Sequence, residues 1–156
     1  MGAVEDYVNT QMVMRDSTAS ILEVAKSMVD WGISSVAITD KKSKKVIGIL
    51  TERDIVNSIA KGGPPDGITA GSLMSSHILS IRSDQPIEEA ALLMIRNKVR
   101  HLLVEDPSRI GVIGIITTTD LARYLKHTMK QTGAAAKENE NERSSELLTE
   151  VWELYF

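Results

Sequence analysis

The apolar residues of the chain follow two periods, and the period changes at corresponding places in the two halves. Residues 21–29 and 87–95 carry apolar side chains at helical spacing, which predicts an amphipathic helix in each segment. VAIT and LLVE, followed by VIGILT and VIGIIT, predict pairs of short strands separated by polar turns. A further helical pattern opens at Asp54 and at Asp120. Each half therefore predicts the order strand, helix, strand, strand, helix, an α/β fold of the α+β kind.

The two halves are copies of one unit. GILTERDI begins at Gly48 and GIITTTDL at Gly114, an offset of 66 residues, and this offset makes twelve of fifty positions identical between 6–55 and 72–121 without a gap. A fixed register over such a length indicates an internal duplication. The expected division is a first repeat, a Gly- and Pro-rich linker, a second repeat and a tail, at 6–61, 62–73, 74–130 and 131–156.

Composition narrows the function classes. The 156 residues contain no cysteine, which excludes disulfides, thiolate metal sites and a cysteine nucleophile and fits a reducing compartment. A net charge of −3 and an aromatic content of 4% make a nucleic acid an unlikely main ligand. No apolar run approaches the roughly 18 residues of a membrane span, and the N-terminus has no secretory pattern. We expect a cytoplasmic protein without membrane association.

One short motif closes the strand pair of each repeat. Gly-apolar-apolar-Thr-x-x-Asp places Thr51 and Asp54 in the first repeat and Thr117 and Asp120 in the second. With the preceding runs ISSVAITD and VRHLLVED, these residues resemble the cystathionine-β-synthase (CBS) domain, over about residues 6–130. The resemblance implies two tandem CBS repeats packed with pseudo-twofold symmetry, and adenosine-containing ligands bound in the clefts between them.

The chemistry of the motif suits such a ligand. A short carboxylate at a strand-to-helix junction, as at Asp54 and Asp120, can accept two hydrogen bonds from the cis-diol of a ribose. Thr51 and Thr117 place a hydroxyl and backbone N–H groups near a helix N-terminus, where a phosphate oxygen is favoured. The motif therefore offers polar groups for both the sugar and a phosphate.

The resemblance implies further contacts on either side of the motif. In the family, basic residues ahead of the middle strand often reach the ligand phosphates; the second repeat has Arg100 and His101 there, whereas the first has Ser34 and Ser35. Arg53, inside the first motif, is another basic candidate. We therefore expect the cleft of the second motif to bind more tightly. The apolar walls for an adenine are expected from the first strand of each repeat, at Met12, Val13, Ile78 and Leu79.

Each candidate also has a structural interpretation. Aspartate and threonine often cap helices, so the alternative interpretation of Asp54 and Asp120 is a purely capping role. Arg53 and Arg100 can simply point into solvent, and His101 can lie at the edge of the core or cap an element. The glycines of the two motifs fit close strand packing better than ligand contact, and we do not include them among the site residues.

No catalytic or metal-binding pattern is found. The histidines are not spaced as metal ligands, and neither a nucleophile elbow nor a Walker lysine occurs. We expect a regulatory protein with no catalytic residue, metal or cofactor, which binds AMP, ADP, ATP or another adenosyl compound and acts on a separate effector protein. The alternatives are a scaffold that acts through its tail and dimer surfaces, and a nucleic-acid-binding adaptor that uses the loop KKSKK.

The C-terminal tail adds an apolar surface. SSELLTEVWELYF has the pattern of an amphipathic helix, and residues 137–156 carry a net charge of −4. We expect this helix to dock on a partner, on a sister subunit or on the repeats themselves. Because two CBS pairs commonly associate through their helices, the resemblance also implies a homodimer with twofold symmetry.

Overall fold

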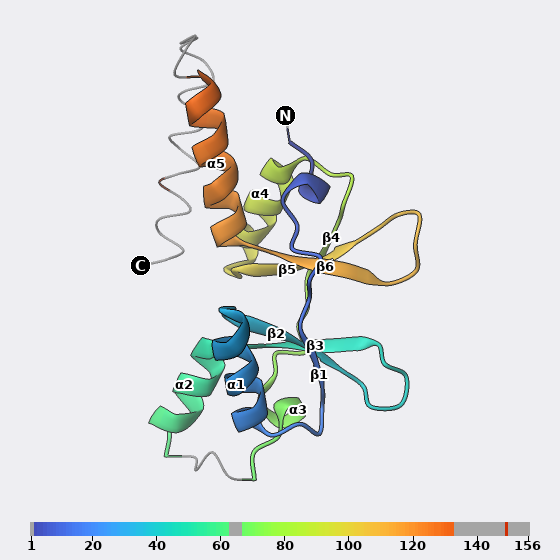
Figure 1. Ribbon diagram of the computed structural model, residues 1–156, viewed down its shortest axis with the longest axis vertical. Helices are drawn as coiled ribbons and strands as arrows, with labels where there is room; N and C mark the ends of the chain where they lie inside the picture. Colours follow the sequence, from blue (N-terminus) through green and yellow to red (C-terminus); the bar gives the residue numbers. More distant parts are fainter. Residues whose placement is uncertain (1, 63–66, 133–148, 150–156) are drawn as a thin grey trace. The chain divides into compact units, whose positions relative to one another are not determined.

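The computed structural model describes residues 2–62, 67–132 and 149 of the chain (Figure 1). The expected amphipathic helix of the tail lies outside these residues. The described residues form two compact units: those within 11–78 make one, and residues 2–10 together with 79–132 make the other. We call them the first-repeat unit and the second-repeat unit, after the sequence repeat that each contains.

The first-repeat unit is a three-stranded sheet with helices. Its elements are β1 (Met14–Asp16), α1 (Ile21–Trp31), β2 (Ser35–Thr39), β3 (Val46–Thr51), α2 (Glu52–Ala60) and α3 (Ala70–Leu73). The strand order is β1-β2-β3, with β1 parallel and β3 antiparallel to β2. Figure 1 shows α1 and α2 side by side, away from the loop that joins β2 to β3.

The second-repeat unit has the same topology. Its elements are the 3₁₀ turn η1 (Val4–Asp6), β4 (Ser80–Arg82), α4 (Ile87–Asn97), β5 (His101–Glu105), β6 (Val112–Thr117) and α5 (Thr118–Thr132). The sheet order is β4-β5-β6, again with one parallel and one antiparallel pair. The predicted α+β fold and the element order of each repeat are confirmed.

Local sequence explains where the long helices begin and end. Ser20 caps α1 in a capping box with Glu23, and Gly32 ends it in the left-handed conformation with φ 60°. Helix α4 follows Pro86 and ends at Lys98, which adopts the same left-handed conformation, φ 54°, without being a glycine. The two helices thus begin and end at matching positions of the two repeats, although only α1 is followed by a glycine.

Each unit has its own apolar core between the sheet and its helices. The first-repeat core consists of Ile21, Val24, Met28, Val36, Ile38, Leu50 and Ala70. The second-repeat core consists of Val4, Ile81, Ile87, Ala90, Ala91, Met94, Leu102, Val104, Ile116 and Leu121. The apolar helix positions predicted from the sequence supply most of the helical residues in these cores. Met28 and Met94, for example, are matching positions of the two repeats, and both are buried.

The segment ahead of the first repeat packs in the second-repeat unit. Val4 is completely buried in that core, and its backbone N–H donates to the carbonyl of Gln85 at 2.9 Å. Asn9 forms an antiparallel bridge with Ile115 of β6. Residues 2–10 therefore complete a unit whose remaining residues begin at Leu79.

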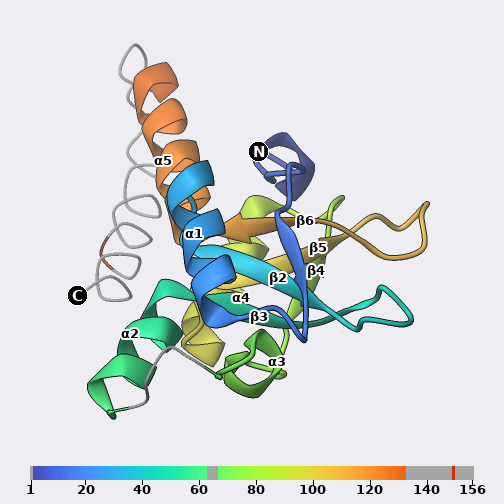
Figure 2. The same ribbon diagram turned by 60° about the horizontal axis from the view of Figure 1, so that its bottom comes forward.

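The segment ahead of the second repeat makes the reciprocal contacts. Ala70 of α3 is buried in the first-repeat core, and its N–H donates to the carbonyl of Ala19 at 2.8 Å. Ser75 bridges Ile49 of β3, and Figure 2 shows α3 beside β3. The stretch 62–73, expected as a linker, thus contributes a helix to the first-repeat unit.

Two glycines allow these segments to pass close to the sheets. A Cβ at Gly114 would stand 2.5 Å from the carbonyl oxygen of Asn9, and a Cβ at Gly48 would collide with the side chain of Met74. A larger residue at Gly114 would push against the backbone of the crossing segment, whereas one at Gly48 would first require the Met74 side chain to move. The structural interpretation of both glycines as close-packing residues therefore agrees with the fold.

Candidate functional site

The first candidate site stands where β3 ends and α2 begins. Thr51 is the N-cap of α2, and its Oγ1 accepts a hydrogen bond from the Asp54 N–H at 3.3 Å. Asp54 Oδ2 in turn accepts from the backbone N–H and from the hydroxyl of Thr51, at 2.9 and 2.7 Å. This reciprocal capping box fixes the half-buried carboxylate at the helix N-terminus.

The second candidate site repeats this geometry at the junction of β6 and α5. Asp120 Oδ2 accepts from the N–H and hydroxyl of Thr117 at 2.9 and 2.7 Å, and the Asp120 N–H donates to Thr117 Oγ1 at 3.4 Å. One bond is added: Arg123 Nη1 donates to Asp120 Oδ1 at 3.0 Å. Both aspartates therefore cap a helix, and the two carboxylates differ in what holds their second oxygen.

Strand pairing brings the basic candidates of the second repeat to the same junction. His101 is directly opposite Thr117 in the β5–β6 register, and the carbonyl of Arg100 accepts from the N–H of Thr118 at 3.2 Å. Both side chains are partly exposed. The structure thus gathers Arg100, His101, Thr117 and Asp120 within one unit, as the sequence repeat predicts.

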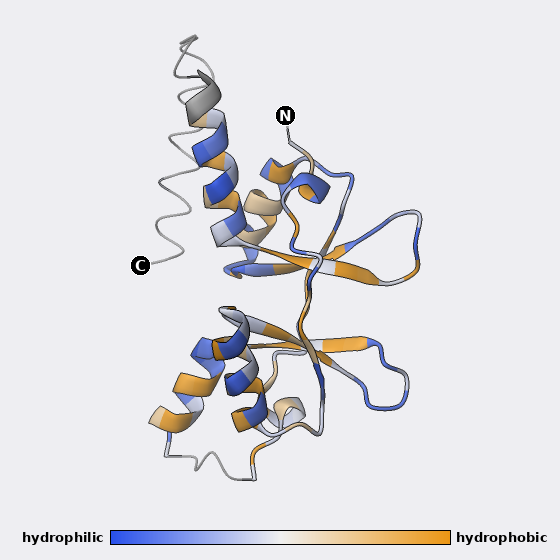
Figure 3. Cartoon of the chain, viewed as in Figure 1, coloured by the Kyte–Doolittle hydropathy of each residue, from blue (hydrophilic) through white to orange (hydrophobic). Residues whose placement is uncertain are grey.

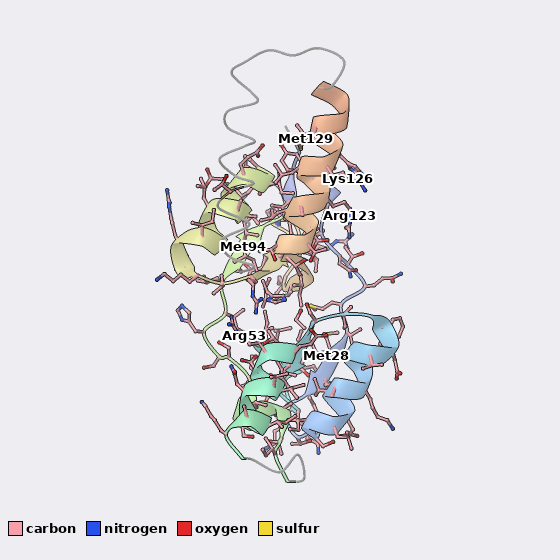
Figure 4. All side chains as sticks on the ribbon, turned by 90° about the vertical axis from the view of Figure 1, so that its left-hand side faces the viewer. Met28, Arg53, Met94, Arg123, Lys126 and Met129 are labelled. Carbon is pink, nitrogen blue, oxygen red and sulfur yellow. The ribbon has the colours of Figure 1, made fainter. Side chains whose placement is uncertain are left out.

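The first repeat has the same backbone arrangement without those cations. Ser35 pairs with Thr51, and the carbonyl of Ser34 accepts from the N–H of Glu52 at 3.0 Å. Arg53 is exposed on the first turn of α2, and Figure 4 shows its side chain coming from that helix. Arg53 therefore stands at the predicted junction, one residue before Asp54.

The four apolar candidates precede the first strand of each sheet. The carbonyls of Val13 and Leu79 accept from the N–H groups of Ala37 and Leu103, at 3.1 and 3.0 Å, and both side chains pack against their cores. Met12 and Ile78 lie one position earlier and are half-buried. Ile78 belongs to the first-repeat unit and Leu79 to the second-repeat unit, so this pair straddles a unit boundary.

Sequence reasoning missed Arg123. It lies one helical turn after Asp120, the spacing at which side chains meet on a helix surface, and it forms an ion pair with that aspartate. The matching residue of the first repeat is Asn57, which carries no charge. A comparison of the two repeats beyond the aspartate would have shown this difference.

The lysine-rich loop between β2 and β3 is held from within. Asp40 Oδ1 accepts from the backbone N–H groups of Lys42 and Ser43 at 3.1 and 2.6 Å. These bonds, the one from Ser43 above all, lower the pKa of Asp40 below its ordinary value. The conformation of this loop is therefore explained by the hydrogen bonds of Asp40 within it.

Among the described residues, no three His, Asp or Glu side chains stand close enough to hold a metal ion. Within the same part of the chain, no helix combines the length and apolar character needed to cross a membrane.

Comparison with known proteins establishes the family. The family model described as the CBS domain matches residues 4–61 and 70–127. Together these ranges cover well over half of the chain, and both include the complete Thr-x-x-Asp motif. The chain belongs to the CBS domain family and contains a tandem pair of these domains, which confirms the resemblance seen in the sequence.

Individual relatives place this pair in several contexts. The uncharacterized protein MK0525 of Methanopyrus kandleri is 31% identical over 134 residues, covering 83% of this chain and 67% of that protein. The L-aspartate semialdehyde sulfurtransferase of Methanocaldococcus jannaschii is 28% identical over 122 residues, 78% of this chain but 23% of the enzyme.

A solved structure is also similar. The CBS domain pair of protein MJ0100, in complex with 5′-methylthioadenosine and S-adenosyl-L-methionine, superposes with a TM-score of 0.73 at 26% identity. The similarity covers 82% of this chain and 98% of that pair. The fold described above is therefore that of a complete CBS domain pair.

Proposed function

We propose that this chain is a regulatory module that binds adenosine-containing small molecules at the carboxylates of Asp54 and Asp120. The observation that carries the proposal is the twofold occurrence of a carboxylate fixed at a helix N-terminus. At Asp54, Oδ1 accepts no hydrogen bond from any described residue and is available to a ribose hydroxyl. A charged acceptor makes that bond stronger than a neutral one.

The ligand class is supported by the MJ0100 pair, whose two ligands both contain adenosine. Methylthioadenosine and S-adenosylmethionine share with AMP, ADP and ATP the ribose diol that a carboxylate recognises. Arg100 and His101 add donors for a phosphate at the second junction. We propose AMP, ADP, ATP and sulfur-containing adenosyl compounds as the candidate ligands.

The proposed role is regulation of an effector protein without catalysis. The sulfurtransferase matches this chain over 23% of its own length, so its catalytic activity does not transfer with the CBS pair. The groups at the two junctions are engaged in capping and ion pairing, which fits binding better than proton transfer. We propose no cofactor beyond the adenosyl ligand.

Isothermal titration calorimetry of the full chain tests the proposal. AMP, ADP, ATP, NAD, S-adenosylmethionine and methylthioadenosine are titrated separately, and at least one should bind with a stoichiometry of one or two per chain. Asp54→Ala combined with Asp120→Ala should abolish that heat while the apo protein still melts cooperatively. Absence of binding by all six compounds contradicts the proposal and favours a scaffold.

A homodimer is the second part of the proposal. Leu22 and Val29 on α1 and Val56 and Ile59 on α2 are large apolar side chains more than half exposed, and Figure 3 shows apolar positions on both helices. Such a group of apolar residues is costly in water and typical of a contact between subunits. Twofold association through these helices would cover it.

A further inference from the structure

The two motif carboxylates differ at their second oxygen. Asp120 Oδ1 accepts from Arg123 Nη1 at 3.0 Å, whereas Asp54 Oδ1 accepts from no described residue. Asn57 is the counterpart of Arg123 at the repeat offset. The difference therefore follows from the residue one turn after each aspartate, which is asparagine in α2 and arginine in α5.

This difference changes what each carboxylate can offer a ribose. A carboxylate has about four acceptor positions. The capping box occupies two at Asp54, but the capping box and Arg123 occupy three at Asp120. A cis-diol that needs two acceptors finds them free at Asp54. At Asp120 it must displace Arg123 or share Oδ1 with it.

Displacing Arg123 has a cost that depends on the ligand. The Asp120 side chain is only 8% exposed, so a lost ion pair there is poorly replaced by water. The Arg123 side chain is 55% exposed and keeps further N–H groups for a new partner. A phosphate is such a partner, because guanidinium and phosphate form strong charge-assisted hydrogen bonds. Methylthioadenosine, which carries neither a phosphate nor a carboxylate, offers nothing in exchange.

The surrounding charges act in the same direction. At the second junction Arg123 pairs with the carboxylate of Asp120, and the backbone carbonyl of Arg100 accepts from the N–H of Thr118. At the first junction, Arg53 is flanked by two carboxylates, Glu52 and Asp54. The second junction is thus the more positive by two formal charges, which favours an anionic ligand.

We infer that Arg123 is a specificity-determining residue that makes the second-repeat carboxylate select phosphorylated adenosine. The first-repeat carboxylate, with Asn57 in the matching position, selects adenosyl compounds that carry no phosphate. The inference rests on the proposed function and assigns different ligands to its two carboxylates. Figure 4 shows the side chain of Arg53 on α2 and that of Arg123 on α5.

The test isolates each carboxylate and exchanges the residue one turn later. In an Asp54→Ala background, Arg123→Asn copies the first repeat; it should weaken AMP binding about tenfold and strengthen methylthioadenosine binding. Arg123→Lys keeps the charge and should retain the preference for AMP. In an Asp120→Ala background, Asn57→Arg should shift the first carboxylate toward AMP without altering Arg123.

The ratio of the AMP and methylthioadenosine dissociation constants decides the matter, measured by calorimetry on variants whose apo melting temperatures are compared first. A purely structural role of Arg123 would change both constants by the same factor. If Arg123→Asn and Asn57→Arg both leave the ratio unchanged in chains that still bind, the inference is overturned while the proposed function stands. If the unmodified chain binds neither AMP nor methylthioadenosine, the inference is overturned; the proposed function is overturned with it only if ADP, ATP, NAD and S-adenosylmethionine also fail to bind.

Discussion

Asp54 and Asp120 each hold a helix start in place while leaving part of the carboxylate for another partner. Their capping boxes are nearly superimposable in bond lengths, with 2.9 and 2.7 Å to the preceding threonine in both cases. The rigid first turn fixes the carboxylate in advance, so a ligand does not have to order it. Arg123 is the one side chain that distinguishes the hydrogen bonds described above for the two carboxylates, since the capping bonds to the preceding threonine are the same in both.

Alanine substitutions of the two aspartates should separate the ligands. Asp120→Ala should weaken AMP binding more than Asp54→Ala, because the removed carboxylate lies beside Arg100 and Arg123. The order should reverse for methylthioadenosine. Each loss should be about 10- to 150-fold at its own site, the value of a hydrogen bond to a charged group. Calorimetry at matched salt measures both, and a larger AMP loss in Asp54→Ala would show that the first carboxylate dominates.

Tyr124 connects the helices of the second-repeat unit. Its hydroxyl donates to Glu88 Oε1 of α4 at 2.6 Å, and its ring meets Tyr7 edge-on with centroids 5.3 Å apart. Burial, followed by the hydrogen bond to Glu88, raises the pKa of Tyr124 from its ordinary value of 10.0 to about 12. The folded state therefore holds this proton more tightly than the unfolded chain.

The pH dependence of stability follows from that direction. Because the folded pKa is raised, the stabilisation by Tyr124 is complete below pH 10 and is lost as the pH rises toward about 12. Tyr124→Phe should lower the free energy of unfolding by about 1–3 kcal/mol near neutral pH, since a partly buried carboxylate loses its donor. Urea denaturation at pH 8 and pH 11 should show a smaller alkaline loss in Tyr124→Phe; parallel losses would contradict it.

At the scale of elements, the reciprocal packing of the two leading segments depends on glycine. Gly114→Ala places a methyl group 2.5 Å from the Asn9 carbonyl, a backbone atom that cannot rotate away. The variant should lose about 1–3 kcal/mol of stability, the usual cost of overpacking. Hydrogen exchange should increase most in residues 2–10. Ile110→Ala, at a fully exposed position, is the control, and equal exchange in both variants would count against the prediction.

The repeat offset made the core of each unit predictable. Once Gly48 and Gly114 were aligned, the alignment paired the helices and strands of the two halves, and the observed strand registers follow it. The sequence did not predict in the same way which unit receives the segments ahead of each repeat, residues 2–10 and the stretch that contains α3. Val4 and Ala70 each lie in a short segment with other apolar residues, but the pattern of so short a segment does not indicate which of two similar cores receives it.

The site was predictable to the same extent. The motif located both carboxylates, because strand ends and helix starts are local features of the sequence. The ion pair of Arg123 was not located, since an arginine three residues after an aspartate is common on helix surfaces and usually contributes little. This ion pair is important because the Asp120 side chain is almost buried, and only the folded structure shows that burial.

At the scale of the whole molecule, association should depend on the apolar surface of α1 and α2. Val29 is 80% exposed, and Val29→Asp should shift a dimer toward monomer because it buries a charge in the contact. Light scattering at micromolar concentration measures the mass. Ile110→Asp introduces the same charge on the β5–β6 loop and should leave the dimer intact. A monomeric unmodified chain would contradict the proposed dimer.

The crossing of the leading segments also constrains the order of events on the ribosome. Residues 2–10 emerge before either repeat, yet their partners at Gln85 and Ile115 emerge only with the second repeat, so they stay unpaired while the first repeat is made. The first-repeat unit is complete once Ile78 has emerged. A nascent chain arrested there should hold one folded unit preceded by a free arm, and the second unit must capture that arm across a long loop. Vectorial synthesis thus gives two halves of the same topology different folding histories.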